Sequence, residues 1–137
     1  MATETASTEI SSIRSSTQNS SSLPDGQVLR VSGTIVDVQF PRESAPDIFN
    51  ELHVTIPEGE AGTQALATLE VEQQLGDGAV RCIAIDSIVG IRRGLTVKNT
   101  GSPIKVPVGQ NVLGRIFNVL GNTIDDKPAF KATERWP

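Results

Sequence analysis

The sequence predicts an all-β fold, a closed antiparallel barrel of six strands, and three observations support this prediction. Short runs rich in Val and Ile follow one another from residue 27 onward. Gly and Pro separate these runs at intervals of roughly ten residues, which is typical of small barrels and sandwiches. Apolar side chains occur on both faces of several runs. Closing the sheet removes the exposed edges that such strands would otherwise present.

The six expected strands occupy residues 28–31, 34–40, 51–56, 63–75, 79–86 and 95–99. Ser32-Gly33 separates the first two, and 57–59 (PEG) ends the third. The fourth run shows the clearest alternation, since residues 65, 67, 69 and 71 share one face and residues 66, 68 and 70 the other. Residues 76–78 (GDG) lie between the fourth and fifth runs and predict a tight hairpin, because Gly adopts the positive φ that such a turn needs.

The amino-terminal residues 1–26 differ from the barrel in composition. Twelve of the first twenty-two residues are Ser or Thr, and apolar side chains are too few to offset the entropy of ordering the segment. We expect a disordered tail. A targeting peptide is the alternative, but the segment lacks an apolar block, and its single Arg14 is outnumbered by Glu4 and Glu9.

The carboxyl-terminal residues 107–137 form a third region. After Gly109, apolar residues recur at three- and four-residue spacing and predict a short amphipathic helix that ends near Gly121: Val112, Leu113, Ile116, Phe117 and Leu120. Residues 122–137 are expected to form a loop. No further element is available to cover the helix, Phe130 and Trp136, so we expect that the chain is a fragment and that this region is loosely packed.

Composition excludes several classes of function. Twelve basic and sixteen acidic residues give a net charge of -4, whereas nucleic-acid binding normally requires a basic surface. Cys82 is the only cysteine and His53 the only histidine, so one chain can form neither a disulfide framework nor a Cys/His zinc cluster. Charged residues interrupt every apolar run before it reaches the roughly 18 residues of a membrane span.

Two glycine-containing segments share part of a nucleotide-binding motif. Residues 109–116 (GQNVLGRI) have the glycine spacing of a phosphate-binding loop, but Arg115 and Ile116 stand where Lys and Ser/Thr are needed. Residues 76–81 (GDGAVR) begin like a dinucleotide fingerprint but have Arg81 in place of the third glycine, and a strand follows instead of a helix. Turns explain both segments better.

Two pairs of carboxylates could in principle serve acid–base or metal chemistry. Glu70 and Glu72 lie two apart on an expected strand and share a face, where a solvated surface stripe is the simpler interpretation. Asp125 and Asp126 follow Gly121 in an expected loop, and turn formation explains them as well as metal binding does.

The remaining candidates are single residues or one basic pair. His53 has no partner nearby in sequence, and Cys82 on an apolar strand behaves as a small hydrophobe. Arg92 and Arg93, between two glycines, could hold an anion or form a solvated turn. The sequence therefore predicts no catalytic, cofactor-binding or metal-ligating residue in this chain.

Several strings, in order, resemble the beta subunit of the F-type ATP synthase. They are 33–41 (GTIVDVQFP), 47–52 (DIFNEL), 69–76 (LEVEQQLG), 80–86 (VRCIAID), 90–94 (GIRRG), 100–109 (TGSPIKVPVG) and 113–121 (LGRIFNVLG). The resemblance covers residues 27–137 and is closer to the beta subunit than to the alpha subunit or to flagellar and vacuolar-type ATPases. Ser87-Ile88-Val89 and Asn99 depart from it, since each lacks an acidic residue that the family usually has there.

The resemblance implies a barrel domain at 27–106 and the start of a nucleotide-binding domain at 107–137. It implies ATP synthesis driven by a proton gradient, with ATP or ADP and Mg²⁺ bound by the parent protein beyond residue 137. The implied partners are alternating alpha subunits in a hexameric ring and the gamma subunit. The implied location is peripheral to a membrane, on the bacterial cytoplasmic side or in the matrix or stroma. The alternative is a stand-alone small barrel that serves as a docking module or an oligonucleotide binder.

Overall fold

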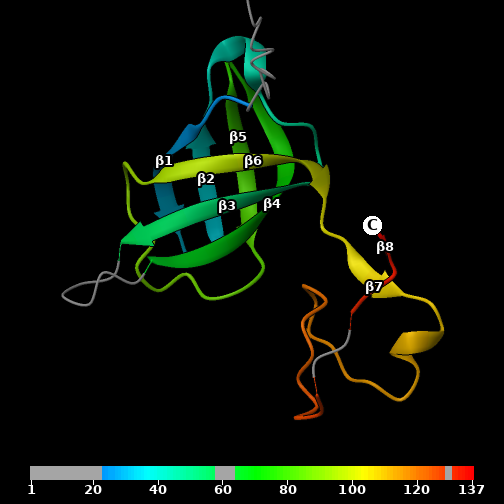
Figure 1. The fold of residues 1–137 in the computed structure, drawn as a ribbon. Helices are drawn as coiled ribbons and strands as arrows, with labels where there is room; N and C mark the ends of the chain where they lie inside the picture. The colour runs from blue at the N-terminus through cyan, green and yellow to red at the C-terminus, as the bar shows by residue number, and fades with distance from the viewer. Residues whose placement is uncertain (1–22, 58–63, 129–130) are drawn as a thin grey trace, which may run out of the picture.

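Six strands close into an antiparallel barrel in the computed structural model, which describes residues 23–57, 64–128 and 131–137 (Figure 1). They are β1 (Gly26–Ser32), β2 (Ile35–Gln39), β3 (Asn50–Pro57), β4 (Gln64–Gly76), β5 (Ala79–Ala84) and β6 (Thr96–Pro103). The all-β prediction and its six strands are confirmed. The expected tail at 1–26 lies almost entirely outside the described residues.

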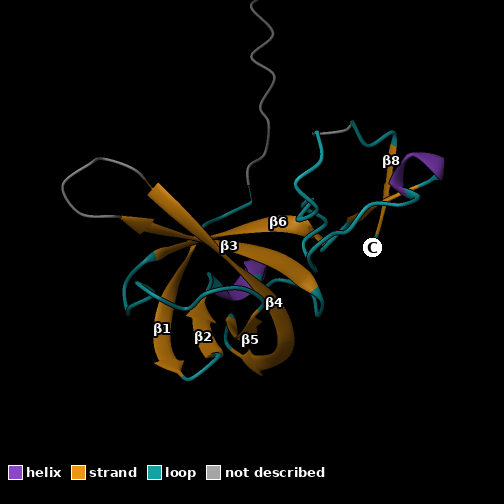
Figure 2. Ribbon diagram, turned by 90° about the horizontal axis from the view of Figure 1, so that it is seen from below, coloured by secondary structure: helices purple, strands orange, loops and turns teal. Residues whose placement is uncertain are grey.

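The strand order around the barrel is β1-β2-β5-β4-β3-β6. Consecutive strands form three of the pairs, whereas β2 pairs with β5 and β3 with β6 through longer connections. The seam between β1 and β6 completes the circle through Gly26 opposite Val97 and Gln27 opposite Thr96. Figure 2 shows the strands surrounding one central space.

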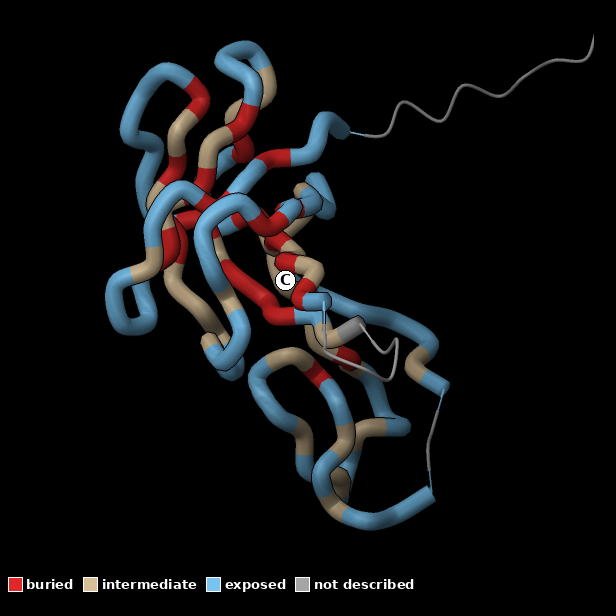
Figure 3. Tube along the Cα trace, turned by 90° about the vertical axis from the view of Figure 1, so that its left-hand side faces the viewer, coloured by how far each residue is buried: buried red, intermediate tan, exposed pale blue. Residues whose placement is uncertain are grey.

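The barrel interior holds the apolar core. Its buried members alternate along the strands with outward residues, as in β3, where Leu52, Val54 and Ile56 are buried and the residues between them are not. Figure 3 shows this alternation as red and paler segments of the tube. The full buried apolar set is Val28, Val36, Val38, Phe40, Leu52, Val54, Ile56, Ala67, Leu69, Val71, Val80, Cys82, Leu95 and Val97. The two faces that alternation predicts for the fourth run are seen in β4, where Ala67, Leu69 and Val71 are buried and Leu66 is exposed, although Thr68 on the same face as Leu66 is buried as well.

The region after Pro103 lies to one side of the barrel (Figures 1 and 2). Two short strands, β7 (Val106–Val108) and β8 (Glu134–Trp136), pair antiparallel, so the expected loop over 122–137 is wrong at its end. Among the described residues from 107 onward, only Pro107 and Gly121 are buried.

The amphipathic helix expected between Gly109 and Gly121 is also wrong. The only helical turn there is a 3-10 helix, η2 (Gln110–Val112), and Leu113 after it is extended. Gly114 has a φ of 73° and Gly121 one of 75°, and this left-handed backbone cannot continue an α-helix. The three- and four-residue spacing of apolar residues thus arises from successive turns. A second 3-10 helix, η1 (Arg42–Ser44), precedes β3. No helix among the described residues is long and apolar enough to cross a membrane.

Candidate functional site

The glycine segment at 109–116 forms turns and does not form a phosphate cradle in the described structure. The Arg115 guanidinium donates to both carboxylate oxygens of Asp125, at 2.6 and 3.0 Å, and also to the Pro128 carbonyl at 3.1 Å. The Arg115 and Asp125 side chains are 12% and 4% exposed, although each residue as a whole is only half-buried. The arginine that stands in the lysine position of a phosphate loop is therefore committed to an internal contact.

Asp125 organises the loop around it. Its carboxylate also accepts hydrogen bonds from the backbone N–H groups of Ile116 and Lys127, each at 3.3 Å. The hydrogen bond from Arg115 and these backbone donors hold the pKa of the Asp125 carboxyl well below its usual value. Asp126 beside it has a φ of 54° and is exposed. The two aspartates thus serve a turn, which is one of the two roles that the sequence left open.

The segment 76–78 is a hairpin turn, as predicted. Gly76 is paired with Ala79, and Asp77 and Gly78 between them have φ values of 52° and 84°. Two central residues with positive φ match the right-handed twist of the strands that they join.

Three glutamates form an acidic strip, Glu51, Glu70 and Glu72, on the outer face of β3 and β4. Glu51 lies directly opposite Glu70 in the strand register. Partial burial, and then the charge of Glu72, raise the pKa of the Glu70 carboxyl. One side-chain contact of this strip joins Glu51 Oε1 to His53 Nε2 at 2.9 Å, which is a surface ion pair when the histidine is protonated.

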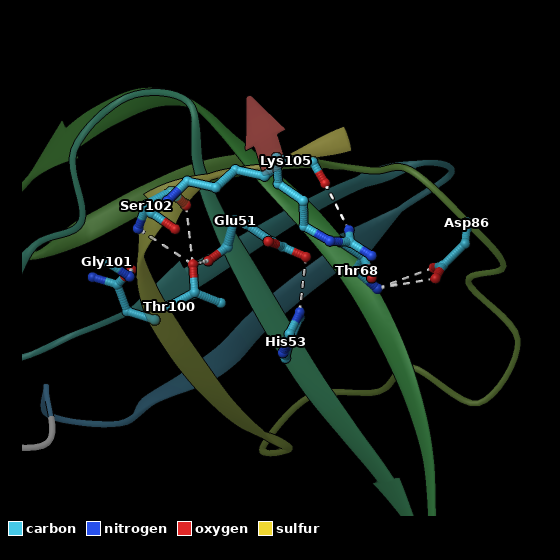
Figure 4. A network of polar contacts seen from close by, with 10 residues as sticks. Glu51, His53, Thr68, Asp86, Thr100, Gly101, Ser102 and Lys105 are labelled. Carbon is cyan, nitrogen blue, oxygen red and sulfur yellow. Dashed lines mark hydrogen bonds and ion pairs between the residues drawn. The ribbon is translucent and has the colours of Figure 1, made fainter. Parts of the chain in front are cut away.

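A network of polar contacts ties β3 to its neighbours at the same level (Figure 4). The Thr100 hydroxyl on β6 donates to the Glu51 carbonyl at 2.9 Å. On β4, the Thr68 backbone N–H is bonded to the Asp86 carboxylate, 3.1 and 3.2 Å from its two oxygens. The first contact satisfies a strand carbonyl at the irregular register between β3 and β6, and the second satisfies a strand N–H opposite the residues that follow β5, so their role is structural.

The remaining candidates are Cys82 and the basic pair at 92–93. Cys82 is fully buried in the barrel core, and this burial raises the pKa of its thiol to about 12, so the unreactive thiol form persists at neutral pH. Arg92 and Arg93 are exposed on the turn that leads to Leu95. Within the described residues, no group of three or more His, Cys, Asp or Glu side chains is placed to bind a metal ion.

The outer face of β1, β2 and β5 carries a feature that the sequence did not reveal. Arg30, Asp37 and Arg81 form a row across these three strands, in direct register. A hollow of about 270 Å³ lies against this row and is lined by Arg30, Ser32, Ile35, Asp37 and Arg81, which we call the basic notch. Strand alternation could have placed Asp37 and Arg81 on the outside, but their contact depends on the pairing of β2 with β5.

One comparison with known proteins identifies the family. A family model described as the ATP synthase alpha/beta family, beta-barrel domain, matches residues 28–101. The chain belongs to this family. The matched residues coincide with the closed barrel from β1 into β6. The ATP synthase alpha/beta family resemblance read from the sequence is thereby confirmed, while the match does not separate alpha from beta subunits.

Proposed function

We propose that the chain is the amino-terminal part of the catalytic beta subunit of an F-type ATP synthase. The observation that carries this proposal is the match of the barrel-domain model to residues 28–101, the same residues that close the barrel. The choice of beta over alpha is supported by the ordered strings from residue 33 to residue 121 that resemble the beta subunit.

The proposed role of this segment is to hold a ring together. A closed barrel whose strands are all paired resists hinge motion, which suits a rigid collar. Its barrel would join those of alternating alpha subunits, in a complex that also contains the gamma subunit and contacts the membrane only indirectly. That complex would lie on the cytoplasmic side in bacteria, or in the matrix or stroma of an organelle.

Residues 107–137 are proposed to begin the nucleotide-binding domain, with ATP or ADP and Mg²⁺ held by residues further along the parent protein. The support is the number of large apolar side chains that this region exposes, namely Leu113, Ile116, Val119, Ile124 and Trp136. Such a concentration of exposed apolar surface in a short region is typical of a segment that packs against another part of a protein.

The test compares the binding of this chain to the alpha subunit with its binding to the beta subunit. The 137-residue chain is mixed with the alpha subunit and, separately, with the beta subunit of an F-type ATP synthase, and each mixture is examined by sedimentation velocity. We expect a complex with alpha and none with beta, because the ring alternates. A complex with beta alone would identify an alpha-subunit fragment. Binding to neither would favour the stand-alone docking module.

The oligonucleotide-binding alternative has less support from the structure. Phe40 is buried in the core, and the exposed Phe49 and Trp136 belong to different parts of the chain, before β3 and on β8. Binding of single strands by small barrels relies on neighbouring exposed aromatic rings in a positive groove. These three side chains do not provide such a row.

A further inference from the structure

The basic notch faces away from the barrel core. The residues that flank Asp37 and Arg81 in sequence are fully buried, so the side chains of Asp37 and Arg81 point outward. Arg30 is exposed on β1, opposite Asp37. Two guanidinium groups and one carboxylate therefore share one stretch of the outer surface.

Arg81 is the arginine that forms hydrogen bonds with Asp37, while the charge of Arg30 acts on this carboxylate without a hydrogen bond. Arg81 donates from Nε and Nη2 to the two oxygens of Asp37, at 2.8 and 3.0 Å, and this contact lowers the pKa of the carboxyl. In the part of the chain that the structure describes, Arg30 forms no ion pair. Its donors, and the edge of Arg81 that does not face Asp37, remain available beside the hollow.

The notch carries a net positive charge, which one further negative group would neutralise. Two arginines against one aspartate leave one positive charge in a chain whose net charge is -4. A single carboxylate would neutralise it and accept a two-pronged hydrogen bond from a guanidinium. A phosphate dianion fits less well, since it would meet the Asp37 carboxylate, and strand N–H groups are committed to the sheet.

The surroundings of the notch favour a protein side chain over a small anion. Ile35, which lines the hollow, is 42% exposed, and its register partner Ile83 on β5 is half-buried. These two side chains form an apolar surface beside the charged groups of the notch. Arginine next to aliphatic surface is a common composition of protein–protein contacts.

We infer that the basic notch holds an Asp or Glu side chain of the neighbouring barrel in the ring, an inference that rests on the proposed function. The acidic strip on β3 and β4 lies across the closed barrel from β1 and β2, so a neighbouring barrel of the same family with this distribution of charge would turn carboxylates toward the notch. Opposite charges on opposite sides favour a head-to-tail contact, the kind of interface from which rings are built.

The first test reverses the charge of Arg30. Arg30→Glu is compared with Arg42→Glu, which makes the same change in net charge. Arg42 is an exposed arginine that lies outside the notch and pairs with Asp77 at 2.9 Å. Binding to the alpha subunit is measured by sedimentation velocity at low and high salt. We expect Arg30→Glu to weaken binding about tenfold or more at low salt and Arg42→Glu to leave it unchanged. Circular dichroism of both variants, and of Arg30→Gln, verifies the fold.

The second test identifies the partner group chemically. A carbodiimide joins a lysine amine to a carboxylate in direct contact, with loss of water, so Arg30→Lys should form a covalent link to an acidic residue of the alpha subunit. The chain without alpha is the control, because Lys at this position can also react with Asp37. A link between subunits supports the inference, and a link to Asp37 alone overturns it.

The outcomes separate the two proposals. Failure of the unaltered chain to bind alpha removes the proposed function and this inference together. Normal binding by Arg30→Glu, or equal weakening by Arg30→Glu and Arg42→Glu, overturns the inference and leaves the proposed function standing. Inorganic phosphate is the third probe, and its binding is followed by the NMR shifts of the Ser32 and Ile35 amides. If phosphate binds there and Arg30→Glu still binds alpha normally, the notch is a site for a free anion instead.

Discussion

At the scale of single residues, Gly78 is the described glycine at which an added Cβ would come closest to another atom. Its φ is 84°, and a Cβ built there would lie 2.3 Å from the Phe40 carbonyl oxygen. The approach is fixed by a hydrogen bond from the Phe40 N–H to the Gly78 carbonyl at 3.0 Å. The tip of the β4–β5 hairpin thus packs directly against the end of β2.

We predict that Gly78→Ala lowers the free energy of unfolding by about 3 kcal/mol or more, since a backbone clash adds to the cost of a left-handed non-glycine residue. Gly33→Ala is the matched control: its φ is 60°, but no atom lies within 4 Å of the added Cβ. That variant should lose only about 1 to 2 kcal/mol. Urea unfolding followed by circular dichroism measures both. Equal losses would show that the contact with Phe40 relaxes freely.

At the scale of elements, the loop from Arg115 to Pro128 depends on the ionised Asp125 carboxylate. Because the folded-state pKa of Asp125 is lowered, its stabilisation is complete above the ordinary value of 3.8 and declines as the pH falls below it toward the folded-state pKa. The loop should loosen in acid. Asp125→Asn should loosen it at neutral pH, since an amide cannot replace the charge that faces Arg115.

The measurement is the NMR signal of the Arg115 Nε–H and of the Ile116 amide, which we expect to lose exchange protection in Asp125→Asn. Asp126→Asn is the control, because Asp126 is exposed and Asn tolerates its positive φ. Unchanged protection in Asp125→Asn would mean that neutral hydrogen bonds alone hold the loop.

At the scale of the whole molecule, the barrel and the region from residue 107 onward differ in burial. The barrel strands contain nearly all the fully buried residues, whereas the described residues after Pro107 contain only Gly121 (Figure 3). Amide exchange depends on local opening, which is easier where few apolar groups are buried. We predict that amides of β2 to β5 exchange orders of magnitude more slowly than those at 109–128. Hydrogen exchange with mass spectrometry tests this, and equal protection would contradict it.

The sequence predicted local features well and distant contacts poorly. Alternation predicted the two faces of β4, and Gly-Asp-Gly predicted the hairpin that follows this strand, because both signals lie within a few residues. The prediction of a helix between Gly109 and Gly121 was wrong, because glycines with a left-handed backbone end helical structure whatever the spacing of the apolar residues. The notch formed by Arg30, Asp37 and Arg81 was missed, because it exists only once strands distant in sequence pair in one register.

The seam of the barrel has a consequence for how the protein is made. Gly26 and Gln27 begin β1, and their partners, Thr96 and Val97, begin β6. The barrel therefore closes only after its last strand has been synthesised and has paired with its first. Such distant pairing carries a large entropic cost and slows folding. On the ribosome, the sheet remains open until residues near 100 have emerged. During that interval the edges of β1 and β3 are exposed, and chaperone protection of the nascent chain matters most.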